Sequence, residues 1–343
     1  MRAAVLRSGR LVVDDVADPT PAFGQVLVRT LACGICGSDL HFMRHAPRMV
    51  ELSRQMAGPM TGSSLDLGRD IVMGHEFAAE VLEPGPDTVA PPAGTVVTSL
   101  PVLVTAEGFV SLAYNNDFPG GYAERMLLSA PLLLEVPNGL SPQQAALTEP
   151  MAVGIHAVGK AGMSQGEAAL VLGCGPVGLA VIAALRLKGI EPIVATDFSP
   201  RRRALARTLG AHESVDPREE PGIEAWRRVD GRKTLVLFEA VGVPGMIDSA
   251  VRDAPLGSRI VVVGVCMEDD VIQPAFAIAK ELNLQFALGY DPVEFSGALR
   301  SIAEGEIDVA PLITGSVDIE GVPGAFDELA HPDAHAKILV EPA

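Results

Sequence analysis

A glycine-rich turn between an apolar strand and an apolar helix constrains the fold of this chain more than any other feature. We expect a strand over residues 169–172 and a helix over 177–188, joined by the turn at 173–178. Further apolar runs without polar alternation occur at 192–196, 234–238 and 259–263. Strands of this kind, joined by helices, are covered on both faces and run parallel. The pattern predicts an α/β fold with a doubly wound parallel sheet.

The residues of this turn also predict a dinucleotide site. Gly173 allows the sharp turn, Gly175 lets the backbone approach phosphates, and Gly178 lets the helix pack closely on the strand. Pro176 and Val177 open the helix, whose free N–H groups can bind a pyrophosphate. A lone glycine motif is weak, but the strand before it and the helix after it supply the required context.

The identity of the dinucleotide depends on the end of the next strand. Asp197 stands there, and its carboxylate can accept hydrogen bonds from the adenosine ribose and would repel a 2′-phosphate. We therefore expect NAD. The basic run 201–203 follows, and Arg202 within it is a candidate cofactor contact, which leaves NADP, or a merely solvated helical turn, as alternatives. Cys174 inside the glycine turn is expected to be a small packed side chain.

The chain before residue 150 has a different pattern. Short apolar runs separated by Gly and Pro occur at 25–28, 78–82 and 132–136. They predict mostly β-structure. Because 343 residues are more than one core usually organises, we expect two domains. We predict a β-rich domain from residues 1–154 and 290–343, and a nucleotide-binding domain from residues 155–289.

Side chains that ligate metals are concentrated in the β-rich part. Cys36, the adjacent pair His75 and Glu76, and Glu149 supply thiolate, imidazole and carboxylate groups. These are the ligand types that Zn²⁺ selects. The pair Cys33 and Cys36 could instead be half of a structural zinc site or a redox pair, although no second Cys pair accompanies it. His75 taken alone could also be a hydrogen-bonded core histidine.

Several motifs resemble those of the zinc-dependent medium-chain dehydrogenases. They are Cys36-Gly37-Ser38-Asp39-Leu40-His41, Gly74-His75-Glu76, Gly120-Gly121-Tyr122-Ala123-Glu124, Glu149-Pro150-Met151-Ala152-Val153 and the glycine turn. The Glu149-Pro150 form is most similar to the polyol branch, with its sorbitol, butanediol and threonine dehydrogenases. The resemblance covers nearly the whole chain. It implies a GroES-like catalytic domain beside a Rossmann domain, and hydride transfer between an alcohol and NAD.

The resemblance also implies roles for single residues of the β-rich domain. Cys36 and His75 would bind zinc, and Glu76 and Glu149 would complete the shell, directly or through the catalytic water. Asp39 would accept the other ring N–H of His75 and so fix its tautomer. Ser38 would take the proton of the substrate and pass it toward solvent through His41.

Other residues resemble those that hold the cofactor. Val263 and Val265 match the backbone that binds the carboxamide, and we place Val241 in the same cofactor pocket. Lys337, near the last expected strand, matches a basic residue that approaches the pyrophosphate.

The sequence departs from the family in one region. Many members carry four closely spaced Cys for a structural zinc, but residues 98–119 contain no Cys and are too few to hold that lobe. We therefore predict one zinc per chain. Because that lobe often lies near subunit contacts, its loss leaves the choice between homodimer and homotetramer open.

Composition and charge limit the classes of binding partner and the cellular compartment that we expect. The net charge of −17 opposes nucleic acid and anionic membranes as partners and leaves a small-molecule alcohol or carbonyl substrate. The N-terminus is too charged for a signal peptide, and four Cys in a chain of this size fit a reducing cytoplasm. The uncharged stretch 168–185 is interrupted by Gly and Pro, so we expect no membrane span there.

Two other functions are compatible with this scaffold. One is a metal-free NAD(P)H quinone or enoyl reductase of the same fold, against which the joint presence of Cys36, His75 and Glu149 argues. The other is a non-catalytic NAD-binding protein, which would have little reason to keep Ser38 and His41 beside the ligands.

Overall fold

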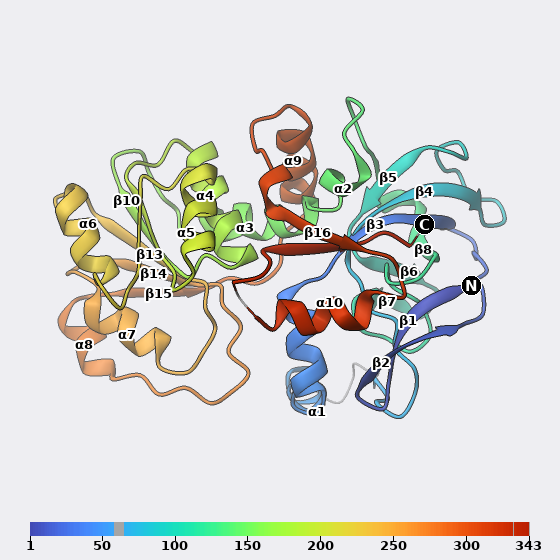
Figure 1. Cartoon of the computed structure of the whole chain (residues 1–343), viewed down its shortest axis with the longest axis horizontal. Helices are drawn as coiled ribbons and strands as arrows, with labels where there is room; N and C mark the ends of the chain where they lie inside the picture. The colour runs from blue at the N-terminus through green and yellow to red at the C-terminus, as the bar shows by residue number, and fades with distance from the viewer. Residues whose placement is uncertain (58–64, 332, 343) are drawn as a thin grey trace. The chain divides into compact units, whose positions relative to one another are not determined.

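The computed structural model describes residues 1–57, 65–331 and 333–342, and it divides the chain into two compact units (Figure 1). The first unit is Met1–Glu149 with Ile313–Ala343, and the second is Pro150–Leu312. The sequence predicts these boundaries at residues 154 and 290. The second boundary lies later because helix α9 (Pro292–Ala303) belongs with the second unit, where Glu294 Oε2 lies 2.7 Å from His156 Nδ1 of helix α3 (Thr148–Lys160).

The second unit contains the expected parallel sheet. Its strands are β10 (Ala168–Leu172), β11 (Ile193–Thr196), β12 (Glu213–Val215), β13 (Leu235–Glu239), β14 (Arg259–Val262) and β15 (Asn283–Phe286). They lie in the order β12-β11-β10-β13-β14-β15, with every neighbouring pair parallel. This order is that of a doubly wound nucleotide-binding sheet, so the predicted fold class of this part is confirmed.

Helices cover both faces of this sheet. They are α4 (Pro176–Leu187), α5 (Pro200–Leu209), α6 (Gly222–Asp230), α7 (Met246–Asp253) and α8 (Pro274–Ala279), with a 3₁₀ turn at Ala310–Leu312. Figure 1 shows α4 and α5 on one side of the strands and α6 and α7 on the other. This placement follows from right-handed crossovers on either side of β10, where the direction of winding reverses.

The long uncharged stretch around the glycine turn is divided between a strand and a helix. β10 takes its first part, and α4 begins after Gly175 with Pro176 in its first turn. Residues 178–185 of α4 are all buried, as expected of a helix that is apolar on every side. Among the described residues, none of the helices combines the length and the apolar character that crossing a bilayer requires.

The first unit is built on a mixed sheet of seven strands. They are β3 (Gln25–Gly34), β4 (Glu76–Pro84), β5 (Val96–Ser99), β8 (Arg125–Ser129), β9 (Leu133–Glu135), β16 (Ile313–Val317) and β17 (Lys337–Val340). The order is β16-β17-β3-β4-β5-β9, with β8 also paired to β3. Apolar residues of these strands and of the β1–β2 hairpin form one continuous core.

Two hairpins and three helices complete this unit. They are β1 (Arg2–Arg7) with β2 (Arg10–Asp15), β6 (Val102–Thr105) with β7 (Gly108–Ser111), α1 (Gly37–Ala57), α2 (Pro142–Ala145) and α10 (Val322–Leu329), with a 3₁₀ turn at Ala130–Leu132. The β6–β7 hairpin occupies the region in which the sequence analysis noted the missing Cys-rich lobe. Helix α1 is kinked at His45, two residues before Pro47, because a proline ring obstructs the preceding turn.

Candidate metal and nucleotide sites

Three candidate metal ligands meet where β3 ends and β4 begins. Strands β3 and β4 are antiparallel, and Gly34 pairs with Glu76 at the end of their register. The chain then passes through Cys36 into α1, while His75 directly precedes β4, so the pairing brings these residues together. One donor atom each from Cys36, His75 and Glu76 lies within 4.8 Å of the others.

The surroundings of this cluster fit a zinc ion. His75 is 8% exposed and Glu76 is fully buried, and thiolate, imidazole and carboxylate are the donors that zinc binds. A Cβ atom at Gly34 would lie 2.0 Å from Glu76 Oε2, so only glycine leaves room for this carboxylate. Glu149, the fourth candidate, is not in the cluster and lies in the first turn of α3.

Asp39 connects the backbone of Cys36 with the ring of His75. Its fully buried carboxylate accepts hydrogen bonds from the Cys36 N–H at 3.0 Å and the Tyr122 hydroxyl at 2.6 Å, and Oδ1 lies 3.5 Å from His75 Nδ1. Burial opposes ionisation of Asp39, but the charge of His75 and the hydrogen bonds to His75, Tyr122 and the Cys36 N–H together outweigh burial and lower the pKa of the carboxyl. Burial also opposes protonation of His75, but the charges and hydrogen bonds of Asp39 and Cys36 together outweigh burial and raise its pKa well above the ordinary value.

The glycine turn of the second unit has the geometry that a phosphate-binding loop requires. Gly173 has φ +91°, and a Cβ atom on Gly178 would lie 2.0 Å from the Gly173 carbonyl oxygen. A Cβ atom on Gly175 would meet nothing within 4 Å, which leaves open space in front of the N-terminus of α4. The positive end of this twelve-residue helix therefore begins at a backbone position that a phosphate can approach closely.

Asp197 directly follows β11 and is tied to the glycine turn. Its Oδ2 accepts the Cys174 N–H and its Oδ1 accepts the Ser199 N–H, both at 2.8 Å. Cys174 is fully buried, and burial raises the pKa of its thiol well above the ordinary value. This agrees with the expectation that Cys174 is a packed side chain.

The remaining cofactor candidates of this unit lie where β13 and β14 end. The Glu239 carboxylate accepts hydrogen bonds from the backbone N–H of Val241 at 2.7 Å and of Gly242 at 2.9 Å. The Val263 N–H donates to the Glu239 carbonyl at 2.8 Å. The side chains of Val241 and Val265 are about half exposed, at 40% and 52%, at the carboxyl edge of the sheet where ligands of doubly wound folds bind.

Comparisons with known proteins identify the family of this chain. The family profile "Alcohol dehydrogenase GroES-like domain" matches residues 22–138, and "Zinc-binding dehydrogenase" matches residues 176–304. The (R,R)-butanediol dehydrogenase of Bacillus subtilis is 31% identical over 344 residues, which cover 96% of each chain. The chain belongs to the zinc-binding alcohol dehydrogenase family. The predicted resemblance is thereby confirmed.

Further relatives of this dehydrogenase are named as sorbitol and butanediol dehydrogenases. Sorbitol dehydrogenase of Bacillus subtilis is 25% identical and covers 100% of this chain and 97% of its own length. The crystal structure of 2R,3R-butanediol dehydrogenase from Bacillus subtilis has a TM-score of 0.83 at 29% identity, covering 100% of this chain and 99% of its own. A dehydrogenase from Sinorhizobium meliloti 1021, described as zinc-binding and bound to NADP, has a TM-score of 0.83 at 25% identity, with 99% of both chains covered.

In this dehydrogenase the two candidate proton carriers lie on one helix. Ser38 and His41 are three residues apart on α1, so their side chains share a helix face. Ser38 Oγ lies 3.4 Å from His75 Nε2. Burial, and then the charges of His45 and Arg44, lower the pKa of His41, so its ring is neutral at a lower pH than a free imidazole.

Tyr114 is a residue of this site that the sequence did not reveal. Its hydroxyl lies 2.9 Å from Ser38 Oγ and 3.2 Å from Asp39 Oδ1, within hydrogen-bonding distance of both. Its ring stacks on Phe42 of α1 at 4.3 Å between centroids. Tyr114 follows the β6–β7 hairpin in the sequence, and no motif or spacing there marks it as functional.

The structure corrects the expectation for Lys337. Its Nζ donates to Glu76 Oε1 at 2.7 Å, to Glu76 Oε2 at 2.6 Å and to the Ile35 carbonyl at 3.1 Å. These contacts use all three N–H groups of an ammonium that is 2% exposed, so the expected contact with a pyrophosphate has no support here. A buried cation needs a buried anion, and Glu76 supplies it.

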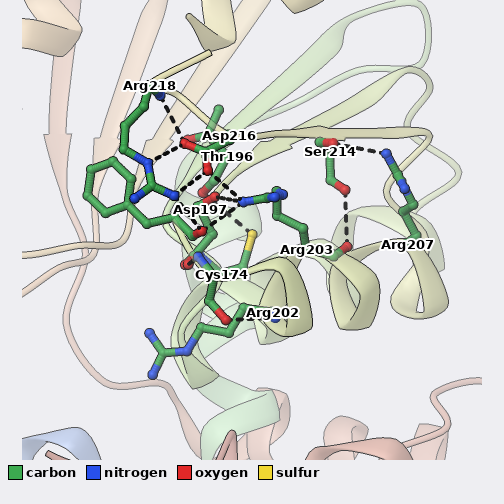
Figure 2. Close-up of polar contacts among 11 residues, drawn as sticks. Cys174, Thr196, Asp197, Arg202, Arg203, Arg207, Ser214, Asp216 and Arg218 are labelled. Carbon is green, nitrogen blue, oxygen red and sulfur yellow. Dashed lines mark hydrogen bonds and ion pairs between the residues drawn. The ribbon is translucent and has the colours of Figure 1, made fainter. Parts of the chain in front are cut away.

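Arg202 occupies the first turn of α5. Its N–H lies 3.4 Å from Ser199 Oγ, the N-terminal cap of that helix, and its side chain points away from Asp216 (Figure 2). The Nε atom is buried without a hydrogen-bond partner among the described residues. Arg202 therefore remains a candidate for a polar ligand.

Proposed function

We propose that this alcohol dehydrogenase binds one zinc ion through Cys36, His75 and Glu76 and uses NAD to oxidise a secondary alcohol, diol or polyol. Glu149 would complete the zinc shell, directly or through a water. The buried cluster of three donors within 4.8 Å carries the proposal. A bound zinc would act as a Lewis acid that lowers the pKa of an alcohol hydroxyl, and NAD would accept the hydride.

The chain itself supplies proton transfer and orientation. Tyr114 can donate to Ser38 Oγ, which leaves the proton of Ser38 for another acceptor and a lone pair for the proton of the substrate. We propose that His41, one helical turn away, passes that proton on to solvent. Asp39 and Tyr122 hold the ring of His75 and the backbone of Cys36 in place, which keeps the ligands preorganised.

The preference for NAD is inferred from Asp197. A carboxylate at the end of β11 can accept hydrogen bonds from the ribose hydroxyls and would repel a 2′-phosphate. The open space before α4, and the edge formed by Val241, Val263 and Val265, offer room for the pyrophosphate and the nicotinamide. The similar Sinorhizobium protein bound to NADP makes a direct comparison of both dinucleotides necessary.

The substrate class is inferred from the relatives and from the motif that begins at Glu149. Two relatives are named for (R,R)-butanediol and sorbitol, and both of these substrates carry hydroxyl groups on neighbouring carbon atoms. The test is a screen of vicinal diols, linear polyols and simple secondary alcohols with NAD⁺ and with NADP⁺, followed by the absorbance of the reduced nicotinamide. Turnover confined to simple primary alcohols would contradict the proposed class.

One zinc per chain and a reducing environment complete the proposal. The β6–β7 hairpin and its flanks contain no Cys, so nothing there could hold a structural zinc of the thiolate type. All four cysteines are free thiols, and Cys36 must stay reduced to bind a metal, which favours the cytoplasm.

We also propose a homodimer or homotetramer that uses β15. This strand ends the sheet among the described residues, and all four of its residues are exposed, with Phe286 at 61% and nearby Leu288 at 86%. An exposed apolar edge strand is a ready template for pairing with the same strand of a second copy. Light scattering of the wild-type protein and of Phe286→Lys tests this, and an unchanged mass would exclude β15 as the interface.

A further inference from the structure

Two arginines approach the end of β11 on the side of Asp216. Arg203 Nη1 donates to the carbonyl oxygens of Asp197 and Phe198, both at 2.8 Å, and to Asp216 Oδ2 at 3.2 Å (Figure 2). Asp216 directly follows β12, the neighbour of β11 in the sheet. The guanidinium of Arg203 is therefore held between the ends of two adjacent strands.

The second arginine is held by the same carboxylate. Arg218 Nε donates to Asp216 Oδ1 at 2.8 Å and Arg218 Nη2 donates to Asp216 Oδ2 at 2.5 Å, a bidentate pair. The guanidinium also lies over the ring of Phe198, at 5.0 Å from its centroid. Asp216 is almost completely buried, whereas the side chain of Arg218 is 65% exposed.

The cluster formed by Asp197, Asp216, Arg203 and Arg218 has no net charge. Asp197 and Asp216 contribute two negative charges, and Arg203 and Arg218 contribute two positive charges. Hydrogen bonds from Arg218 outweigh the effect of burial and hold the pKa of Asp216 well below its usual range, so it is ionised at neutral pH. A phosphate group binds best to a guanidinium whose donors are not already engaged by a carboxylate.

We propose that Asp216 is a second specificity residue against NADP, acting by holding the guanidinium groups of Arg203 and Arg218 away from a 2′-phosphate. This inference rests on the proposed use of NAD. Asp197 would repel the 2′-phosphate directly, whereas Asp216 holds two of the nearby cations, Arg203 and Arg218, that would otherwise attract it. Specificity is a difference of two affinities, and this arrangement lowers the affinity for the unwanted dinucleotide without a contact to the preferred one.

The test removes the negative charge of Asp216 and keeps the size and shape of its side chain. Asp216→Asn keeps the Oδ1 acceptor that receives the Arg218 backbone N–H at 3.0 Å, so the local turn is retained. Calorimetry with NADH and with NADPH gives affinities that need no knowledge of the alcohol substrate. We expect Asp216→Asn to bind NADPH about tenfold more tightly and NADH within about twofold of wild type.

Two further variants test whether the gain in NADPH affinity comes from the release of Arg218. Adding Arg218→Gln to Asp216→Asn should abolish the gain in NADPH affinity, because the released cation is then absent. Glu220→Gln is the matched control, since the Glu220 carboxylate accepts hydrogen bonds from Arg228 Nε and Nη2, both at 3.0 Å. It removes one negative charge nearby and should leave the NADPH affinity unchanged.

The outcomes separate this inference from the proposed function. Wild-type protein that binds neither dinucleotide, or binds NADPH as tightly as NADH, contradicts the proposed use of NAD. Wild-type protein that prefers NADH, with no gain in NADPH affinity for Asp216→Asn, overturns the role of Asp216 alone. Equal weakening of both dinucleotides, or the same gain in Glu220→Gln, also overturns it, because the effect is then structural or a general effect of charge.

Discussion

The ammonium group of Lys337 lies 2.6 and 2.7 Å from the two carboxylate oxygens of Glu76, and both side chains are almost completely buried. Glu76 is also one of the three donors of the candidate zinc site. One carboxylate is therefore placed between a protein cation and the position expected for a metal ion. Its charge is compensated by Lys337 even when no metal is bound.

Replacing Lys337 by Met should destabilise the metal-free protein strongly. The substitution leaves the Glu76 carboxylate buried without its cation, a change that costs about 3–5 kcal/mol in comparable cases. Zinc should recover part of this loss, because the metal supplies positive charge next to the same carboxylate. Chemical unfolding with and without zinc measures both effects. Lys188→Met, at an exposed position, is the control, and an equal change in the two variants would contradict this account.

Zinc binding should weaken steeply as the pH falls. Burial, and then the charge of Glu76, raise the pKa of Cys36, while Asp39 and Cys36 together outweigh burial and raise the pKa of His75. Both groups must lose a proton to bind zinc. At a pH where both groups are protonated, two protons are displaced and the affinity should fall about a hundredfold per pH unit; where only one of them is protonated, it should fall about tenfold. Competition with a chromophoric chelator at several pH values checks this, and a pH-independent affinity would refute it.

Cys36→Ser should disrupt the metal site and leave the nucleotide site intact. We expect the zinc content to fall to background and the turnover to fall by at least about a hundredfold, because a hydroxyl is a poor replacement for a thiolate ligand. NADH binding should be unchanged, because the glycine turn and Asp197 belong to the other compact unit. Metal analysis and calorimetry on the same sample provide the readouts. Cys266→Ser should behave as wild type, and substantial turnover by Cys36→Ser would rule out the proposed zinc site.

Tyr114→Phe should lower turnover without removing the metal. The substitution removes the hydroxyl that lies within hydrogen-bonding distance of Ser38 Oγ and Asp39 Oδ1 but keeps the ring that stacks on Phe42. General acid–base groups contribute factors of about 10²–10⁴, and a group that only positions one should contribute less, about tenfold. The pH profile of turnover should shift, while zinc content and NADH affinity stay constant. Tyr290→Phe is the control, and a loss of zinc in Tyr114→Phe would show a purely structural role.

Sequence patterns predict those parts of the fold in which the interacting residues are close together in the sequence. The glycine turn, its helix and Asp197 follow each other within one βαβ segment, so spacing alone predicted their arrangement. Cys36, His75 and Glu76 were recognised from motifs, and the pairing of β3 with β4 explains their proximity.

The contacts that the sequence did not reveal join distant segments of the chain. Lys337 and Glu76 are 261 positions apart, and Tyr114 and Ser38 are 76 apart. No periodicity or spacing connects such pairs, because the topology of the sheet decides which segments become neighbours. The boundary near residue 290 was misplaced for the same reason, since the His156–Glu294 contact joins two helices that are far apart in sequence.

The most direct test of the central claim is a zinc titration of metal-free protein during NAD⁺ reduction with a vicinal diol such as butanediol. The account predicts no turnover without metal and a linear rise that ends at about one zinc per chain, as expected for one catalytic site with an open ligand position. Full turnover by the metal-free protein, or a rise that ends at two zinc ions per chain, would contradict it.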